Sequence, residues 1–221
     1  RNTSHISSDW FNYYSCYFIW MVNKMLAHGL NIIERGNQSI IIVDIDQNGV
    51  NEMFAVTSGT NDLNGNLISP GYFYAVESTD DVSTLSFSNF NLFGTYDGGL
   101  RQITIGDADS DGNANLYIAG HYNEAIFDWE FIGGDPLSAE SYLERIVFMD
   151  DTTDSFTPNN DQGKVRVAKL FSGDIDNDGN GDIVFSSGSF ASDKPQLFMI
   201  EHEEESLSTK FINHNILDEF K

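Results

Sequence analysis

Short apolar runs alternate along most of this chain with stretches rich in Asp, Asn, Gly and Ser. The runs are rich in Val, Ile, Phe and Tyr, and many are apolar at consecutive positions, which is typical of strands buried on both faces. Turn-forming stretches such as 61–66 and 97–99 separate them. The pattern predicts an all-β fold with strands at 40–43, 53–56, 72–76, 84–90, 102–105, 116–119, 126–132, 142–149, 165–171, 183–185, 196–200 and 208–212.

One acidic segment occurs three times at nearly constant spacing. It reads DIDQNGVNEMFAV from Asp44, DADSDGNANLYIA from Asp107 and DIDNDGNGDIVFS from Asp174, with first aspartates 63 and 67 residues apart. Each copy stands between two predicted strands, and each period holds about four strands, which is the content of one propeller blade. A single sandwich does not repeat its loop chemistry at constant phase. We therefore expect a β-propeller of four-stranded blades.

The repeat divides the chain into three blades, at 38–100, 101–163 and 164–221. Three blades do not close a ring, since propellers usually have about four to eight. We expect the chain to be part of a larger propeller, completed by missing blades or by another chain.

The N-terminal segment 1–37 is different because it is rich in aromatic residues, with WFNYYSCYFIWMV at 10–22. Neither strand nor helix periodicity is clean there, and this run is too short to span a bilayer as a helix. Three interpretations stay open: a buried strand or packed helix, an element at 10–33 that contacts a partner or a membrane, and a true span.

The charge of the chain narrows the classes of partner. Thirty-four acidic residues against 11 basic ones give a formal net charge of −23. Such a chain lacks the broad basic face of a nucleic-acid binder and is disfavoured on anionic lipid surfaces. Carboxylates at this density either repel one another or bind cations. The one cysteine, Cys16, excludes an internal disulfide and a multi-thiolate metal site.

The three acidic segments, which we call acid loops one (44–52), two (107–115) and three (174–182), carry the strongest chemistry. Oxygen side chains stand at positions 1, 3, 5 and 9, Gly stands at position 6, and position 7 offers its backbone carbonyl. Hard oxygen donors in a flexible loop suit Ca²⁺ rather than Mg²⁺ or zinc. The candidate ligands are Asp44, Asp46, Asn48, Val50 and Glu52; Asp107, Asp109, Asp111, Asn113 and Asn115; and Asp174, Asp176, Asp178, Asn180 and Asp182.

An EF-hand needs a bidentate Glu at position 12. Position 12 is Ala55, Ile118 or Phe185 here, so the EF-hand interpretation is excluded. The pattern D-x-[DN]-x-[DN]-G-x-x-[DNE] between strands resembles the FG-GAP/VCBS repeats, which also occur in integrin α-subunit β-propellers. The resemblance covers about 38–221, although Phe93-Gly94 alone hints at the literal Phe-Gly words.

The resemblance implies one structural calcium ion, about three in all, in the loop that joins the first two strands of each blade. It implies as ligands the side chains at positions 1, 3, 5 and 9 of each loop. Asn48, Glu52 and Asn115 depart from the usual aspartate, so acid loops one and two have three carboxylates each and acid loop three has four. We expect acid loop three to bind calcium most tightly.

No P-loop, G-x-S-x-G or H-E-x-x-H motif is present, and no catalytic residue is assigned. The sequence favours a calcium-stabilised extracytoplasmic propeller that serves as a structural, adhesion or recognition module. Its location is expected to be extracellular, at the cell surface, or periplasmic or lumenal, because weak loops need roughly millimolar calcium.

The partner is expected to be a protein or a carbohydrate on the face opposite the calcium loops. Asp97, His121 and Tyr122 are the weaker candidates for contacts there, and residues 92–99 are expected to form a loop on that face. Two alternatives stay open: the propeller domain of a polysaccharide-active enzyme, and a subunit of a membrane complex docked through 10–33.

Overall fold

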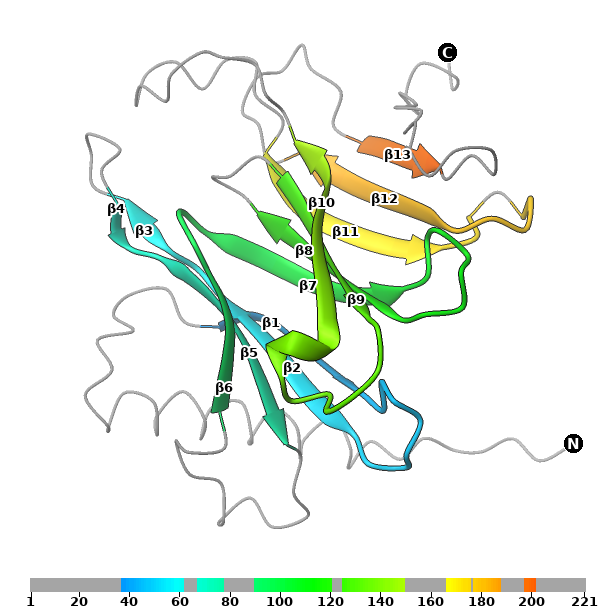
Figure 1. Ribbon diagram of the computed structural model, residues 1–221. Helices are drawn as coiled ribbons and strands as arrows, with labels where there is room; N and C mark the ends of the chain where they lie inside the picture. The colour runs from blue at the N-terminus through cyan, green and yellow to red at the C-terminus, as the bar shows by residue number, and fades with distance from the viewer. Residues whose placement is uncertain are drawn as a thin grey trace, which may run out of the picture.

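A computed structural model of the chain describes residues 37–61, 67–77, 90–120, 125–149, 166–175, 177–187 and 197–201. These residues form an all-β fold of three antiparallel sheets with three or four strands each, which confirms the predicted fold class at that level (Figure 1). The segment 10–33, on which the interface and membrane interpretations rest, lies outside these ranges. In the part of the chain that the structure describes, no helix is long and apolar enough to cross a membrane.

Each sheet is a meander in which strands that follow one another in the chain are neighbours, apart from one inserted hairpin. The first sheet consists of β1 (Asn37–Val43), β2 (Glu52–Thr57), β5 (Gly71–Glu77) and β6 (Phe90–Tyr96), and the hairpin β3 (Thr60–Asn61) and β4 (Leu67–Ser69) interrupts it. The second consists of β7 (Leu100–Gly106), β8 (Asn115–Gly120), β9 (Ala125–Phe131) and β10 (Tyr142–Met149), with a 3-10 turn, η3 (Ala139–Ser141), before β10. The third consists of β11 (Val167–Gly173), β12 (Asp182–Ser187) and β13 (Leu197–Glu201).

One loop prediction is wrong. The fourth strand of the first sheet spans Phe90–Tyr96, whereas the sequence pattern predicted a strand at 84–90 and a loop at 92–99. Phe93 and Tyr96 are buried in the core, and Gly94 leaves room for the Tyr96 ring, because a Cβ there would lie 2.8 Å from Tyr96 Cε2. Gly94 is therefore a packing residue within a strand rather than a turn residue. Residues 84–89 and the predicted strand at 208–212 lie outside the described residues.

The strand β8 shows why the apolar runs are continuous. Its residues Leu116 and Ile118 join a core cluster with residues of the first sheet, whereas Tyr117 and Ala119 join a second cluster with residues of the third sheet. Successive side chains of a strand point to opposite faces of its sheet. The second sheet is therefore buried on both faces, between the first and the third.

Backbone segments that are distant in the chain approach each other closely at two glycines. Gly181, in acid loop three, donates its N–H to Ser110 Oγ of acid loop two at 3.1 Å, and a Cβ at this position would lie 2.3 Å from Asp107 O. At Gly59, after β2, a Cβ would lie 2.0 Å from the carbonyl oxygen of Gly98 in the β6–β7 turn. No side chain fits at either position without backbone movement.

We expect alkaline pH to unfold the protein through its buried tyrosines. Burial raises the pKa of Tyr74 to about 12, and burial also raises the pKa values of Tyr96, Tyr117 and Tyr142. Because unfolded tyrosine ionises near pH 10, their contribution to stability is complete below about pH 10 and is lost as the pH rises through the folded-state pKa values. Ultraviolet absorbance and circular dichroism against pH should show phenolate appearing together with loss of structure. Full ionisation of all tyrosines near pH 10 with the sheets intact would contradict this.

Candidate metal centres

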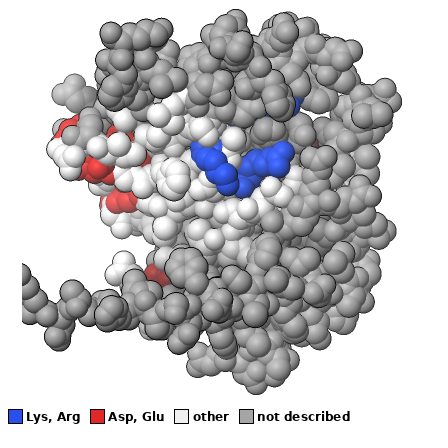
Figure 2. Space-filling view, turned by 180° about the vertical axis from the view of Figure 1, so that it is seen from behind, with Lys and Arg blue, Asp and Glu red and all other residues white. Residues whose placement is uncertain are grey.

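The three acid loops occupy the same place in their sheets. Each joins the first strand to the second, namely β1 to β2, β7 to β8 and β11 to β12, and position 9 (Glu52, Asn115 or Asp182) is the first residue of the second strand. All three lie on the same side of the molecule (Figure 1). In the view from behind, most of the acidic side chains that can be seen lie at one edge, away from the basic side chains near the middle (Figure 2).

The loops share one backbone conformation. Position 4 is left-handed in each, with φ of 58° at Gln47, 55° at Ser110 and 65° at Asn177. Gly at position 6 has φ of 92°, 90° and 96° in acid loops one, two and three, a region that favours glycine. Its N–H donates to the position 1 carboxylate at 2.8, 3.0 and 3.2 Å in the same order. Three different sequences therefore fold the same turn around their first aspartate.

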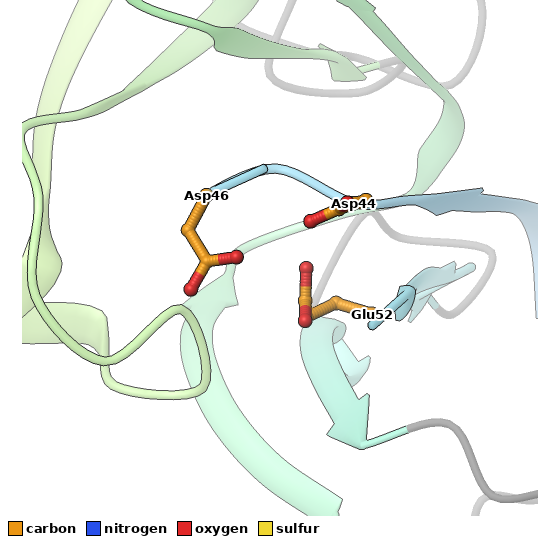
Figure 3. A group of neighbouring side chains, drawn as sticks. All are labelled: Asp44, Asp46 and Glu52. Atoms are coloured by element: carbon orange, nitrogen blue, oxygen red, sulfur yellow. The ribbon is translucent and has the colours of Figure 1, made fainter. Parts of the chain in front are cut away.

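Acid loop one brings three carboxylates together. Asp44, Asp46 and Glu52 each offer an oxygen within 4.8 Å of the others (Figure 3). Glu52 is 3% exposed, and its Oε2 accepts the N–H of Ile45 at 3.1 Å. Burial raises the pKa of Glu52, and the charges of Asp46 and Asp44 raise it further. Among the described residues no ion pair reaches these three carboxylates, so this group can hold a metal ion.

Acid loop two brings Asp107, Asp109 and Asp111 together within the same 4.8 Å limit, so it too can hold a metal ion. The Oδ1 atoms of Asp109 and Asn115 are shielded from solvent and accept no hydrogen bond. Leaving a buried oxygen without a partner costs about 1–3 kcal/mol. A bound hard cation would satisfy such oxygens, so the donor set of this loop fits a cation that prefers oxygen ligands.

Acid loop three is described in part, because Asp176 lies outside the described residues. Asp182 is 1% exposed, and its Oδ2 accepts the N–H of Ile175 at 2.7 Å, as Glu52 accepts that of Ile45 in acid loop one. Asn180 donates its Nδ2 to Asp178 Oδ2 at 3.0 Å. The predicted set of four carboxylates in this loop therefore stays a prediction.

Several predicted ligands are engaged in hydrogen bonds within or beside their loops. Asn48 donates to Asp46 Oδ2 at 2.8 Å and accepts the N–H of Val50 at 2.7 Å. Asn113 donates to Asp111 Oδ2, and Asn115 donates to Asp128 Oδ1 at 2.9 Å. The backbone carbonyl ligands proposed at position 7 stay a prediction.

Of the three weaker candidates for the opposite face, the structure describes Asp97. Asp97 is exposed in the turn that joins β6 to β7. His121 and Tyr122 lie outside the described residues.

The sheet register places a glutamate beside position 9 in every sheet, which the sequence analysis missed. Glu77 is paired with Glu52, Glu130 with Asn115 and Glu201 with Asp182, on the third strand of each sheet. These glutamates follow position 9 by 25, 15 and 19 residues, so they have no constant spacing. Glu130 is buried, which raises its pKa, and it accepts a hydrogen bond from Asn113 of acid loop two.

No protein-family model matches this chain, and no match was found among curated proteins. The resemblance to the FG-GAP/VCBS repeats therefore stays a prediction that rests on the pattern of the acid loops.

Proposed function

We propose that the chain is a calcium-stabilised β-propeller module, without catalytic activity, that serves in extracytoplasmic structure, adhesion or recognition. The observation that carries the proposal is the recurrence of one acid-loop conformation, at the same place in three successive sheets, with carboxylates that converge in the two loops described in full. Calcium would be held by the side-chain oxygens at positions 1, 3, 5 and 9. Its chemistry there is to neutralise the carboxylates and join the first two strands of each sheet.

The arrangement of the sheets supports the propeller interpretation. The first strand of each sheet contacts the first strand of the next, β1 with β7 and β7 with β11, as expected where inner strands surround an axis. Phe171 of β11 is 62% exposed, whereas Ile41, at the corresponding position of β1, packs against the core cluster that joins the first two sheets. We therefore propose that the outer face of the third sheet is covered by a further blade or by another chain.

The recognition surface is proposed at the end of the sheets away from the acid loops. There the segment after β2 meets the β6–β7 turn at Gly59 and Gly98. Connecting segments held by a rigid scaffold are the usual place for ligand contacts. A protein or a carbohydrate is the proposed partner, and the acidic character of the chain argues against nucleic acid.

Thermal unfolding of the full chain, stripped of metal by a chelator, tests the calcium proposal. When calcium is present at 100 times the dissociation constant of a loop, its binding there adds about 2.7 kcal/mol to the free energy of unfolding. Each kcal/mol raises the unfolding midpoint of a domain of this size by roughly 2–4 °C. We expect calcium to raise the midpoint by more than about 10 °C and magnesium by much less. Equal midpoints with and without about 10 mM calcium would contradict the proposal.

A further inference from the structure

We infer that Arg145 is a built-in counter-ion of acid loop two, which shares Asp109 with the bound calcium and lowers the affinity of this loop relative to acid loop one. The inference rests on the proposed function, because it concerns the same metal ion. According to this inference, a residue outside the loop sets the calcium affinity of one of the three proposed sites.

Arg145 stands on β10, two strands away from acid loop two, and its guanidinium reaches back to the loop. Its Nη2 lies 3.3 Å from Asp109 Oδ2 and 2.8 Å from Asp128 Oδ2, and it also pairs with Glu130. Its Nε donates to the same Asp128 oxygen at 3.1 Å. One cation therefore links position 3 of the loop to two carboxylates on β9.

Two shielded oxygens of this loop accept no hydrogen bond and are open to a metal ion. Asp109 uses Oδ2 for Arg145, and its Oδ1 is shielded from solvent without a hydrogen bond. Asn115, at position 9, is 0% exposed, and its Oδ1 also accepts no hydrogen bond while its Nδ2 donates to Asp128. Asp109 is thus placed to contact the guanidinium through one oxygen and a divalent cation through the other.

The first sheet provides an internal comparison. Position 11, counted from the first aspartate of the loop, is Tyr117 in the second sheet and Phe54 in the first. Across the second sheet, Tyr117 is paired with Asp128, which is paired with Arg145. Across the first sheet, Phe54 is paired with Ala75, which is paired with Asn91. Asp128 and Arg145 therefore correspond to Ala75 and Asn91, which are uncharged. Acid loop one has the same number of loop carboxylates as acid loop two but lacks this ion pair, whose cation is the member that contacts the loop, at Asp109.

The position 2 amide shows a second consequence of this arrangement. In acid loops one and three this N–H donates to the carboxylate at position 9. In acid loop two, Ala108 donates instead to the Tyr117 hydroxyl at 3.0 Å, while Asn115 is bound to Asp128. The Arg145 network therefore changes how position 9 is held, and it adds a positive charge that repels a divalent ion at short range.

The test uses the full chain and follows calcium binding at each loop separately by heteronuclear NMR. The amide groups of Gly49, Gly112 and Gly179 report on acid loops one, two and three, because each donates to the first carboxylate of its own loop. In the wild type, the Gly112 signal should respond at higher calcium than the Gly49 signal. In Arg145→Gln, the Gly112 midpoint should fall by about tenfold, while the Gly49 midpoint stays unchanged.

Two further variants separate charge from packing. Arg145→Lys keeps the positive charge, so its Gly112 midpoint should stay within about threefold of the wild type. Arg101→Gln removes an equal charge from the start of β7, where Arg101 donates to Gln38, and should leave all three midpoints unchanged.

Each result supports or overturns the inference. An unchanged or higher Gly112 midpoint in Arg145→Gln overturns it while Gly49 still responds to calcium. Arg145→Gln that folds only with calcium supports it, because the metal then replaces the missing charge, whereas a variant that stays unfolded in about 10 mM calcium overturns it. If none of the three glycines responds in the wild type, the proposed calcium function fails first and the inference fails with it.

Discussion

Replacing the first aspartate of all three acid loops by asparagine should abolish the calcium-dependent rise in the unfolding midpoint. Asp44, Asp107 and Asp174 each accept the N–H of the position 6 glycine, and asparagine keeps one acceptor oxygen while it loses the charge that a divalent ion needs. The expected loss is about 2.7 kcal/mol for each loop when calcium is present at 100 times its dissociation constant.

Without calcium the same triple variant should be at least as stable as the wild type. Burial raises the pKa of Glu52, and the charges of Asp46 and Asp44 raise it further, as expected for carboxylates that repel one another in acid loop one. Removing the charge of Asp44 relieves that repulsion in acid loop one. The variant therefore shifts stability in opposite directions with and without calcium, a result that general damage to the fold does not produce.

Asp97→Asn is the matched control, since it removes one carboxylate from the exposed β6–β7 turn, away from the acid loops. It should keep the full response to calcium. Differential scanning calorimetry at several calcium concentrations measures both effects. A triple variant that still gains as much from calcium as the wild type would show that the ions bind elsewhere.

The strands were predictable because their local signal is strong. Strand β8 of the second sheet packs Leu116 and Ile118 into one core cluster and Tyr117 and Ala119 into another. Its sequence is therefore apolar at consecutive positions. The fourth strand of the first sheet has a weaker signal, since Leu92 is exposed and Gly94 is a small residue packed beside Tyr96. A glycine in a strand looks like a turn unless its neighbour in the fold is known.

The convergence of the loop carboxylates was predictable for a different reason. Alternate positions of one tight loop meet at one centre, so spacing alone identified the group formed by Asp44, Asp46 and Glu52. The residues that surround acid loop two come from other strands. Asp128, Glu130 and Arg145 are brought there by sheet register, and the connections between strands differ in length from one sheet to the next. No fixed spacing in the sequence marks them.

The contacts of the side chain at position 9 could not be predicted from the loop sequence alone. Glu52 and Asp182 lie against their loops, as their hydrogen bonds to position 2 show. Asn115 was predicted to have the same role. Its Nδ2 donates to Asp128, a buried acceptor on the next strand, while its Oδ1 accepts no hydrogen bond, so its role as a ligand stays a prediction. A neighbour across the sheet therefore decides how a loop residue is used.

Truncating Phe54 to alanine should cost about 3–5 kcal/mol, the usual price of removing a fully buried aromatic ring. Its side chain is 0% exposed, and its ring centroid lies 6.2, 6.1 and 6.3 Å from those of Phe73, Phe93 and Tyr142. Because Tyr142 belongs to the second sheet, the loss weakens the packing between two sheets. The midpoint should fall by roughly 6–20 °C in thermal unfolding.

The same variant connects the core to the proposed metal site. Ile45, at position 2 of acid loop one, packs in the same cluster as Phe54 and is 4% exposed. A cavity beside Ile45 makes the position of acid loop one less fixed. Calcium should therefore bind acid loop one more weakly, as reported by Gly49, whereas its binding to acid loop three, as reported by Gly179, should be unchanged. Leu143→Ala, at a position 47% exposed on β10, is the control and should change neither the midpoint nor the binding. If Phe54→Ala lowers the midpoint no more than Leu143→Ala does, the two sheets are not held together by this cluster.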